Sequence, residues 1–434
     1  MSGTARLAEL FGRRRFTIKP GLERILSLLE RHGHPEQRFT AVHVVGTNGK
    51  GSTAAMLATM LTQAGYTTGL FTSPHLISYA ERFQVNGTLI SAAELERLTS
   101  LLLDTATPEE TFFELTTALA CLWFAASQVQ IGVLEAGMGG RSDATAAVPS
   151  PLTVITPIGL DHCQWLGTST TAIAVEKVAI AAPGSCVVSA RQEPDVQQVI
   201  STYCLNHQCR LVLQDQDFTL TTDTNGSLHY CSTDSSLQQV RLNLNGQYQI
   251  DNAAVALAAA EQLTAIGFPV PPAALLNGLA TTRWPGRMEL IRLDDGINLL
   301  LDGAHNPAGA EALSRSLAAM AAMADSAAPR KLLLLGMMAD KVPTSILQPL
   351  VHQFKRVITV TPNQDRSLPA AQLAAACRTA GFPCVEEADT TAEGLQKARA
   401  VMQPGDLLVA AGSLFLVAEL KALLSGVPCE AVRG

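Results

Sequence analysis

A glycine-rich segment between an apolar run and a helical pattern constrains this fold more than any other feature. Residues 46–52 read Gly-Thr-Asn-Gly-Lys-Gly-Ser, after the apolar run Ala41–Val45 and before a helical pattern over Ser52–Ala64. Glycines let successive N–H groups point at an anion, a helix N-terminus adds positive potential, and a lysine neutralises phosphate. We therefore expect the following residues to bind the phosphates of a nucleotide: Thr47, Asn48, Gly49, Lys50, Gly51 and Ser52.

The segment departs from the strict nucleotide-binding pattern at two positions. A strict Walker A loop places Gly at position 44 and Ser or Thr at position 51, whereas this chain has Val44 and Gly51. A glycine-rich turn without a ligand is the alternative interpretation. Lys50 and Ser52 favour the phosphate loop, because a bare turn requires neither of them.

Apolar runs alternate with helical stretches beyond this loop, which is typical of a parallel α/β fold. The expected strands are Ala41–Val45, Gly69–Thr72, Ile131–Ala136 and Thr153–Ile158, and the expected helices are Ser52–Ala64, Phe113–Ala126 and Asn252–Ile266. A small antiparallel patch is expected from the alternating segments Phe218–Thr222, Leu228–Cys231 and Val240–Leu244.

A second block of alternation follows the break at residues 284–287. Its expected strands are Asn298–Leu301, Lys331–Leu335, Val357–Val360 and Leu407–Ala410, and its expected helices are Pro307–Met323, Pro343–Phe354, Leu368–Ala380, Thr391–Val401 and Leu414–Leu424. A chain of 434 residues is long enough for two domains. We predict a P-loop-type, mostly parallel sheet domain with the antiparallel patch over residues 1–283. A smaller Rossmann-like domain is expected over residues 284–434.

Composition excludes several classes of protein. The net charge of −7 argues against nucleic-acid binding through phosphate contacts. The apolar run Leu115–Ala126 is too short for a membrane span, which takes about 20 residues. The N-terminus lacks the charged-then-apolar pattern of a signal peptide, and the cysteines form no metal-binding motif. We expect a cytoplasmic monomer that acts on small molecules, with no nucleic-acid or membrane partner.

Polar residues follow three of the expected strands. Glu135 ends an otherwise apolar run, Ser73 follows the second strand, and His162 follows the fourth. Ligands of an open α/β sheet bind at the carboxyl ends of its strands, so these three groups can converge on one ion. Nucleotide chemistry requires Mg²⁺, a hard ion that takes oxygen ligands. An ordinary loop histidine is the alternative for His162 taken alone.

Nine short motifs, read in chain order, resemble one known family. They are residues 46–52, Thr72-Ser73-Pro74-His75-Leu76, Phe113-Glu114-Leu115-Thr116, the segment 135–145, Gly159-Leu160-Asp161-His162, Glu176-Lys177, Asn252-Ala253-Ala254, Trp284-Pro285-Gly286-Arg287 and the segment 301–307. Together they resemble the folylpolyglutamate synthase and dihydrofolate synthase family within the Mur ligases.

The resemblance implies roles for individual residues. It implies ATP and Mg²⁺ as cofactors, with a monovalent cation as a further candidate. Residues implied to contact the nucleotide beyond the loop are Asn252, Arg287 and Asp302; the implied metal ligands are Ser73, Glu135 and His162. The implied folate-site residues are Thr111, Phe112, Phe113, Glu114, Ser142, Asp143 and Ala144, and His305 is implied in the glutamate pocket, with Asp340 and Lys341 as candidates beside it.

Lys177 is implied to be carbamylated, which would turn a cation that repels Mg²⁺ into an anionic oxygen donor. On its own, Glu176-Lys177 is a solvated charge pair, which is the usual case. Asp302 and Asn252 have helix capping as their structural alternatives.

The expected function is ATP-dependent ligation of L-glutamate to dihydropteroate, to reduced folates, or to both, through an acyl phosphate. Two alternatives stay open: a Mur-type amide ligase for another carboxylate, and a non-catalytic ATP-binding paralogue. Joint retention of Lys50, Glu135, His162 and Lys177 argues against the paralogue. Departures from the family pattern at Val178-Ala179, Ala146 and Val342 leave the second substrate less defined than the ATP chemistry.

Overall fold

An eight-stranded sheet forms the centre of the larger lobe in this computed structural model, which describes residues 3–13, 21–223, 226–322, 329–427 and 430. The strand order is β4-β3-β2-β5-β1-β6-β7-β8, and all neighbours from β2 to β8 run parallel. The strands are β1 (Thr40–Val45), β2 (Thr68–Phe71), β3 (Phe83–Val85), β4 (Thr88–Leu89), β5 (Ile131–Glu135), β6 (Leu152–Ile155), β7 (Cys186–Ser189) and β8 (Arg210–Leu213). Because β2, β5, β1 and β6 are neighbours, the loops after them meet at one edge of the sheet.

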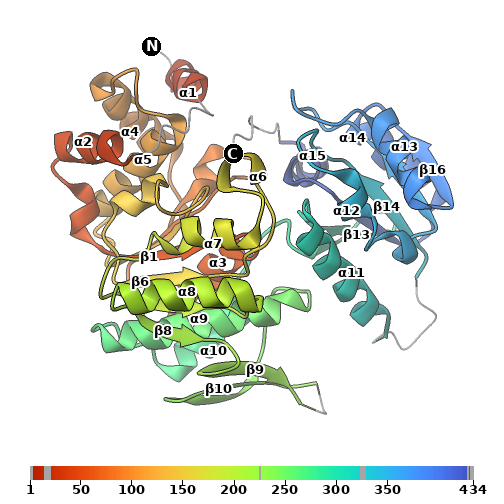
Figure 1. The fold of residues 1–434 in the computed structure, drawn as a ribbon. Coiled ribbons are helices and arrows are strands. Elements are labelled where there is room, and N and C mark those ends of the chain that lie inside the picture. The colour runs from red at the N-terminus through yellow and green to blue at the C-terminus, as the bar shows by residue number, and fades with distance from the viewer. Residues whose placement is uncertain (1–2, 14–20, 224–225, 323–328, 428–429, 431–434) are drawn as a thin grey trace.

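Helices cover both faces of this sheet (Figure 1). Side chains of successive strand residues point to opposite faces, so Val42 and Val44 pack into one core while Ala41 and Val45 face the other side. The helices on the Val42 face are α3 (Lys50–Gln63), α9 (Tyr248–Ala265) and α10 (Pro272–Thr281). Those on the other side are α1 (Gly3–Gly12), α2 (Glu23–Arg31), α4 (Ala92–Thr105), α5 (Phe112–Ala126), α7 (Thr170–Val178) and α8 (Pro194–Asn206), and the short α6 (Cys163–Leu166) precedes α7.

A three-stranded antiparallel sheet packs beneath α9, as the patch prediction requires (Figure 1). Its strands are β9 (Phe218–Thr222), β10 (Leu228–Ser232) and β11 (Ser236–Val240). The prediction of a strand over Val240–Leu244 is wrong, because the strand ends where that segment begins. The backbone N–H of Asn243 donates to Leu279 O at 3.2 Å, so these residues pair with the end of α10 instead of with β10.

The smaller lobe contains a six-stranded sheet in the order β12-β13-β17-β14-β15-β16, parallel except for β12. Its strands are β12 (Glu289–Arg292), β13 (Asn298–Leu301), β14 (Lys331–Leu335), β15 (Arg356–Thr359), β16 (Cys384–Glu387) and β17 (Leu407–Ala411). One face packs on α11 (Pro307–Ala322), α12 (Pro343–Leu347) and α13 (Ala370–Ala380), and the other on α14 (Thr391–Val401) and α15 (Leu414–Ser425).

Prolines shorten two of the predicted elements. The expected helix Pro343–Phe354 is wrong as one element: α12 ends at Leu347, and a separate 3₁₀ helix covers Val351–Gln353. Pro349 lies between them, and proline lacks the N–H that a helix interior needs. The expected strand Thr153–Ile158 ends at Ile155, since Pro157 cannot donate to a neighbouring strand. Strands β7 and β8 extend the sheet at segments for which no strand was predicted.

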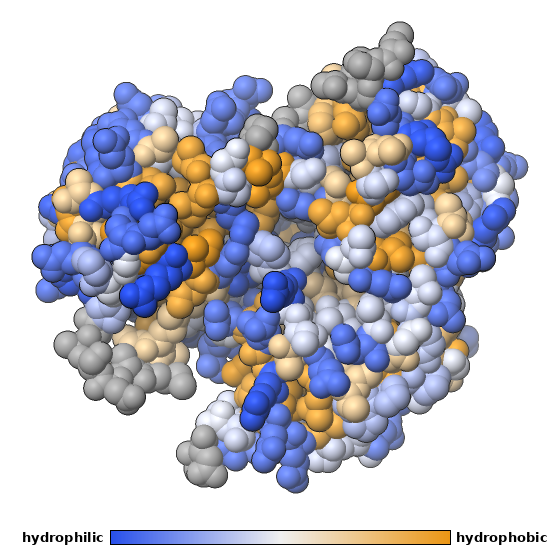
Figure 2. Space-filling view, turned by 180° about the vertical axis from the view of Figure 1, so that it is seen from behind, coloured by the Kyte–Doolittle hydropathy of each residue, from blue (hydrophilic) through white to orange (hydrophobic). Residues whose placement is uncertain are grey.

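The two lobes are joined near residues 282–288 and leave a hollow between them, which the space-filling view shows from behind (Figure 2). Within the described residues, no helix combines the length and apolar character that crossing a bilayer would require.

Candidate active site

A cavity of about 300 Å³ lies between the lobes, at the carboxyl edge of the large sheet. Its wall includes residues 46–52 of the glycine-rich loop together with Ser73, Glu135, Asp161, His162, Lys177, Asn252, Arg287, Asp302 and His305. The cavity therefore brings together most residues that the sequence predicted for nucleotide, metal and amino-acid binding, from both lobes.

Hydrogen bonds to the segment after β6 hold the phosphate loop in shape. Thr47 N donates to Pro157 O at 3.0 Å, and Thr47 Oγ1 both donates to Gly159 O and accepts from Gly159 N at 3.0 Å. Gly49 has a φ of 89°, and a Cβ there would collide with the Asn252 side chain. The loop thus leads directly into the N-terminus of α3, where its N–H groups can face an anion.

Lys50 and Ser52 occupy the first turn of α3, at the positions expected for phosphate binding. Lys50 Nζ donates to Thr47 O at 3.1 Å, so the ammonium group lies over the loop. Ser52 is buried, and its hydroxyl accepts from Gln249 Nε2 at 3.3 Å. Gly51 admits the Trp284 indole, since a Cβ would lie 2.8 Å from that ring. This close approach explains why the loop has Gly at the position where the strict pattern has Ser or Thr.

The predicted metal ligands Ser73, Glu135 and His162 all line the cavity. Ser73 N donates to Glu135 Oε2 at 3.1 Å, which fixes the carboxylate at the end of β5. Burial raises the pKa of Glu135, while the charge of Lys50 opposes that shift. A buried carboxylate is costly without a cation, so this site favours a bound positive ion.

His162 meets the chemical requirement for a metal ligand. Burial lowers its pKa to about 4, which leaves a neutral ring with a free lone pair at neutral pH. Among the described residues, no three or more His, Cys, Asp or Glu side chains form a group that could hold a metal ion. The set proposed here therefore mixes a hydroxyl, a carboxylate and an imidazole, and two of its three members offer the oxygen atoms that a hard cation prefers.

Lys177 is buried on α7 and is not a solvated partner of Glu176. Its Nζ donates to Gly46 O at 2.8 Å, and burial together with the charge of Lys50 lowers its pKa to about 7. Glu176 instead lies 3.5 Å from Arg141 Nε. A Cβ at Gly140 would collide with the backbone of α7, so Gly140 allows this helix to approach the loop after β5.

Asn252, Arg287 and Asp302 lie where the lobes join. Asp302 accepts from Tyr248 Oη at 2.8 Å and from the backbone N–H groups of Met288 and Ala304 at 3.0 and 2.9 Å. Burial raises the pKa of Asp302, opposed by the charge of Arg287. Asp302 thus ties α9 to the second lobe, a role beyond the helix cap considered from the sequence.

The seven predicted folate-site residues are not part of the cavity wall. Thr111 and Glu114 form a capping box at the start of α5, and Arg24 Nη2 pairs with Glu114 Oε1 at 2.9 Å. Asp143 is buried and accepts from Met138 N and from both N and Oγ1 of Thr145. Phe112 and Ala144 are buried, Phe113 is half-buried, and Ser142 is exposed. The structure therefore gives several of them local structural partners.

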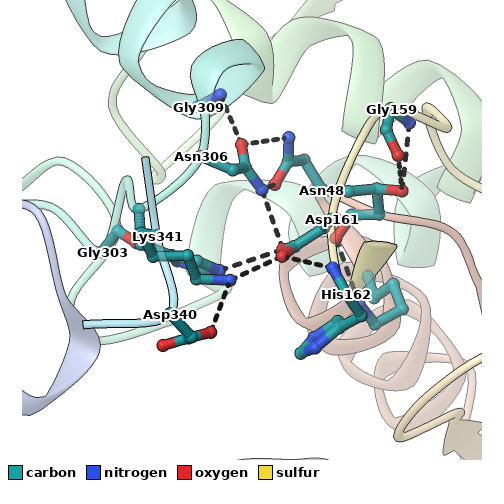
Figure 3. Close-up of polar contacts among 12 residues, drawn as sticks. Asn48, Gly159, Asp161, His162, Gly303, Asn306, Gly309, Asp340 and Lys341 are labelled. Carbon is teal, nitrogen blue, oxygen red and sulfur yellow. Dashed lines mark hydrogen bonds and ion pairs between the residues drawn. The ribbon is translucent and has the colours of Figure 1, made fainter. Parts of the chain in front are cut away.

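Two residues at the meeting point of the lobes had no role in the sequence prediction. Asp161 accepts hydrogen bonds from Lys341 and Asn306 of the second lobe and approaches His305 (Figure 3). Asp161 appeared in the Gly-Leu-Asp-His motif and Asn306 in the segment 301–307, so both were visible as parts of motifs. Their function depends on contacts between segments 145 residues apart, which no local pattern indicates.

The chain matches two known domain families, which together cover most of it. The Mur ligase middle domain matches residues 44–260, and the Mur ligase glutamate ligase domain matches residues 286–414. Dihydrofolate synthase/folylpolyglutamate synthase of Bacillus subtilis (strain 168) is 39% identical over 321 residues, covering 71% of this chain and 74% of that protein.

Two solved structures share nearly the whole fold. E. coli FolC in complex with DHPP and ADP has a TM-score of 0.88 at 28% identity, covering 98% of both chains. The Yersinia pestis folylpolyglutamate synthase/dihydrofolate synthase complexed with AMPPNP and Mn ion has a TM-score of 0.87 at 28% identity, again covering 98% of both chains.

Both domain matches place the chain in the class of Mur ligases. At 39% identity over more than two thirds of each chain, the protein belongs to the dihydrofolate synthase/folylpolyglutamate synthase family of that class.

Proposed function

We propose that this protein uses ATP to join L-glutamate to a pterin-bearing acid, either dihydropteroate or a reduced folate. One observation carries the proposal: a phosphate loop, a buried carboxylate and a buried lysine share one cavity with residues of the second lobe. The names of the relatives point to the same activity, and their complexes contain ADP, or AMPPNP with Mn.

The first half-reaction is phosphoryl transfer. A carboxylate oxygen of the acceptor attacks the γ-phosphorus of ATP, the bond to the bridging oxygen breaks, and ADP leaves with that electron pair. Lys50 and the loop N–H groups bind the transferring group, and Arg287 adds a guanidinium that can pair with phosphate oxygens. The product on the acceptor is an acyl phosphate.

Ser73, Glu135 and His162 would hold Mg²⁺, and a carbamate on Lys177 would add an anionic oxygen near them. When bound, the ion neutralises charge on the phosphate oxygens. The low pKa of Lys177 supports carbamylation, because only the neutral amine reacts with carbon dioxide.

The second half-reaction forms the amide. The amino group of glutamate attacks the acyl carbon, phosphate leaves, and the nitrogen gives up a proton. His305 lines the cavity from the second lobe, where we assign it to the amino acid. The position of the cavity between two lobes allows closure to exclude water, which would otherwise hydrolyse the acyl phosphate.

The acceptor is tested by measuring phosphate release with ATP, L-glutamate and one acid at a time. Dihydropteroate, a reduced folate and an unrelated Mur-type carboxylate are the three probes, and product mass identifies the amide. We expect release with one or both pterin acids and none with the unrelated acid. Nucleotide binding without release on any acid would instead favour a non-catalytic paralogue.

Residues 111–114 and 142–144 are proposed to contact the acceptor from outside the ATP cavity. Variants there should alter the KM for the acid more than the KM for ATP.

We further propose a cytoplasmic monomer, for which light scattering should give a mass near 45.9 kDa.

A further inference from the structure

Asp161 lies where segments of both lobes meet, and both of its carboxylate oxygens are engaged (Figure 3). Oδ1 accepts from Lys341 Nζ at 2.6 Å and from the backbone N–H of His162 at 2.9 Å. Oδ2 accepts from Asn306 Nδ2 at 3.1 Å and lies 3.4 Å from His305 Nε2. Only 9% of the Asp161 side chain is exposed, so these contacts are poorly screened by water.

Asn306 connects this carboxylate to the phosphate loop. Asn306 Nδ2 donates to Asn48 Oδ1 at 3.0 Å, and Asn48 Nδ2 donates back to Asn306 Oδ1 at 3.1 Å. Gly309 N donates to the same Asn306 oxygen at 2.8 Å, which anchors the amide to the first turn of α11. One side chain of the second lobe therefore contacts both the phosphate loop and Asp161.

Lys341 finds its nearer anion in the opposite lobe. Its Nζ lies 2.6 Å from Asp161 but 3.6 Å from its own neighbour Asp340, whose side chain is more exposed. An ion pair within one lobe would stabilise that lobe whatever its position. The Asp161–Lys341 pair instead stabilises the closed arrangement, because it forms only when the lobes meet.

We infer that Asp161 is a positioning residue that couples the phosphate loop to the second lobe and so places His305 at the cavity. The clasp consists of Asn48, Asp161, His305, Asn306 and Lys341. This inference rests on the proposed ligase activity. As a consequence, when the phosphate loop has its nucleotide-binding conformation, the clasp keeps the second lobe closed against the cavity. The cavity is then closed before the amino group of glutamate attacks the acyl phosphate.

The test is steady-state kinetics of Asp161→Asn, which keeps the size of the side chain but removes its charge. We expect the KM for glutamate to rise about 10-fold, the effect of losing one charge-assisted hydrogen bond, while the KM for ATP changes less than about 3-fold. Phosphate released per amide formed should rise from about one to about three or more, because water enters the loosened cavity.

Two further variants separate coupling from folding. Lys341→Met breaks the pair from the other lobe and should reproduce both effects, whereas Lys341→Arg keeps the charge and should largely restore them. Ser316→Ala is the matched control, since it removes a 3.1 Å bond from Gln247 N between the lobes outside the clasp. It should leave the ratio of phosphate to amide at the wild-type value.

Unchanged glutamate KM and unchanged stoichiometry in both Asp161→Asn and Lys341→Met would overturn the inference, whatever happens to thermal stability. A wild-type protein that releases no phosphate would contradict the proposed function instead. In that case hydrogen exchange still decides the clasp: AMPPNP with Mg²⁺ should protect residues 303–309 in the wild type. If AMPPNP with Mg²⁺ protects residues 303–309 equally in Asp161→Asn, Asp161 does not couple the phosphate loop to the second lobe.

Discussion

Individual side chains in the cavity have their charges set by burial. Lys50 lies next to the phosphate loop and donates to Thr47 O, whereas Lys177 is held by the carbonyl of Gly46 with its pKa lowered to about 7. Two lysines that line one cavity, on α3 and α7, therefore differ in chemistry: one is suited to bind phosphate, and the other to react as a neutral amine. Because Lys50 and Lys177 have different surroundings, a separate experiment tests the role of each.

Replacement of Lys50 by methionine should remove phosphoryl transfer without unfolding the protein. The side chain contributes one donor to a developing charge, and loss of such a group typically lowers kcat by about 10²–10³-fold. Phosphate release measures the loss, and thermal unfolding is the control, because the hydrogen bond of Lys50 goes to Thr47 O within the same loop. A variant that retains more than a tenth of kcat would argue against a direct role for Lys50.

Carbamylation of Lys177 should make activity depend on bicarbonate and pH. Carbon dioxide reacts with the neutral amine, whose fraction falls as pH drops through about 7. Enzyme depleted of carbon dioxide at pH 6 should therefore be slow to recover, and recovery with bicarbonate should be faster at pH 8. Carbon-13 NMR of enzyme treated with labelled bicarbonate would detect the carbamate carbon.

The variant Lys177→Ala supplies the complementary measurement. It should lose most of its activity, roughly 100-fold, and acetate or formate should restore part of it by replacing the lost oxygen donor. Full activity of Lys177→Ala without any added carboxylate would count against the carbamate.

At the scale of elements, most of the strands around the site could be predicted because they are short buried runs that end at polar residues. Ile131–Glu135 is one such run, and Glu135 at its end is a residue for which the sequence predicts a metal-ligand role. Strands β7 and β8 escaped prediction because the apolar run of β7, Cys186–Val188, lies between two serines, and most of β8 is at least partly exposed. Leu242 and Leu244 resembled strand residues because they pack against the core without belonging to a sheet.

The start of α5 contains residues that we assign to the folate site, and mutation can test whether they act there or only stabilise the helix. Thr111 Oγ1 accepts from Glu114 N, and Glu114 Oε2 accepts from Thr111 N at 2.7 Å. Thr111→Ala should lower the free energy of unfolding by about 1 kcal/mol through loss of the cap, and Thr111→Ser should lose much less. Urea unfolding measures both.

Ser91→Ala is the matched control, because Ser91 caps α4 in the same way by accepting from Glu94 N. It should cost similar stability yet leave the KM for the pterin acid unchanged. If Thr111→Ala and Ser91→Ala change that KM equally, Thr111 acts through the helix alone and the assignment to the folate site fails.

At the scale of the whole molecule, the cavity that we assign to ATP and the amino acid is lined by residues of both lobes. The segment that joins the lobes contains Arg287, which lines the cavity. Asp302, which follows β13 in the second lobe, accepts a hydrogen bond from Tyr248 of the first lobe. Such shared contacts mean that a ligand in the cavity stabilises both lobes together. The sequence could indicate each half of the site, but the clasp depends on how the lobes meet.

Removal of the divalent ion should therefore be visible in the stability of the whole molecule as well as in catalysis. AMPPNP with Mg²⁺ at about 100 times its Kd should add about 2.7 kcal/mol to the free energy of unfolding and raise Tm in one cooperative transition. EDTA should remove most of that gain and all phosphate release, because Glu135 would face the phosphates without a cation. Mn²⁺, a hard ion that takes similar ligands, should restore both.

Glu135→Gln should respond weakly to either metal, since it lacks the carboxylate charge. A Tm gain from AMPPNP that is the same with EDTA as with Mg²⁺ would show that the nucleotide binds without the ion, and the assignment of Ser73, Glu135 and His162 would then be wrong.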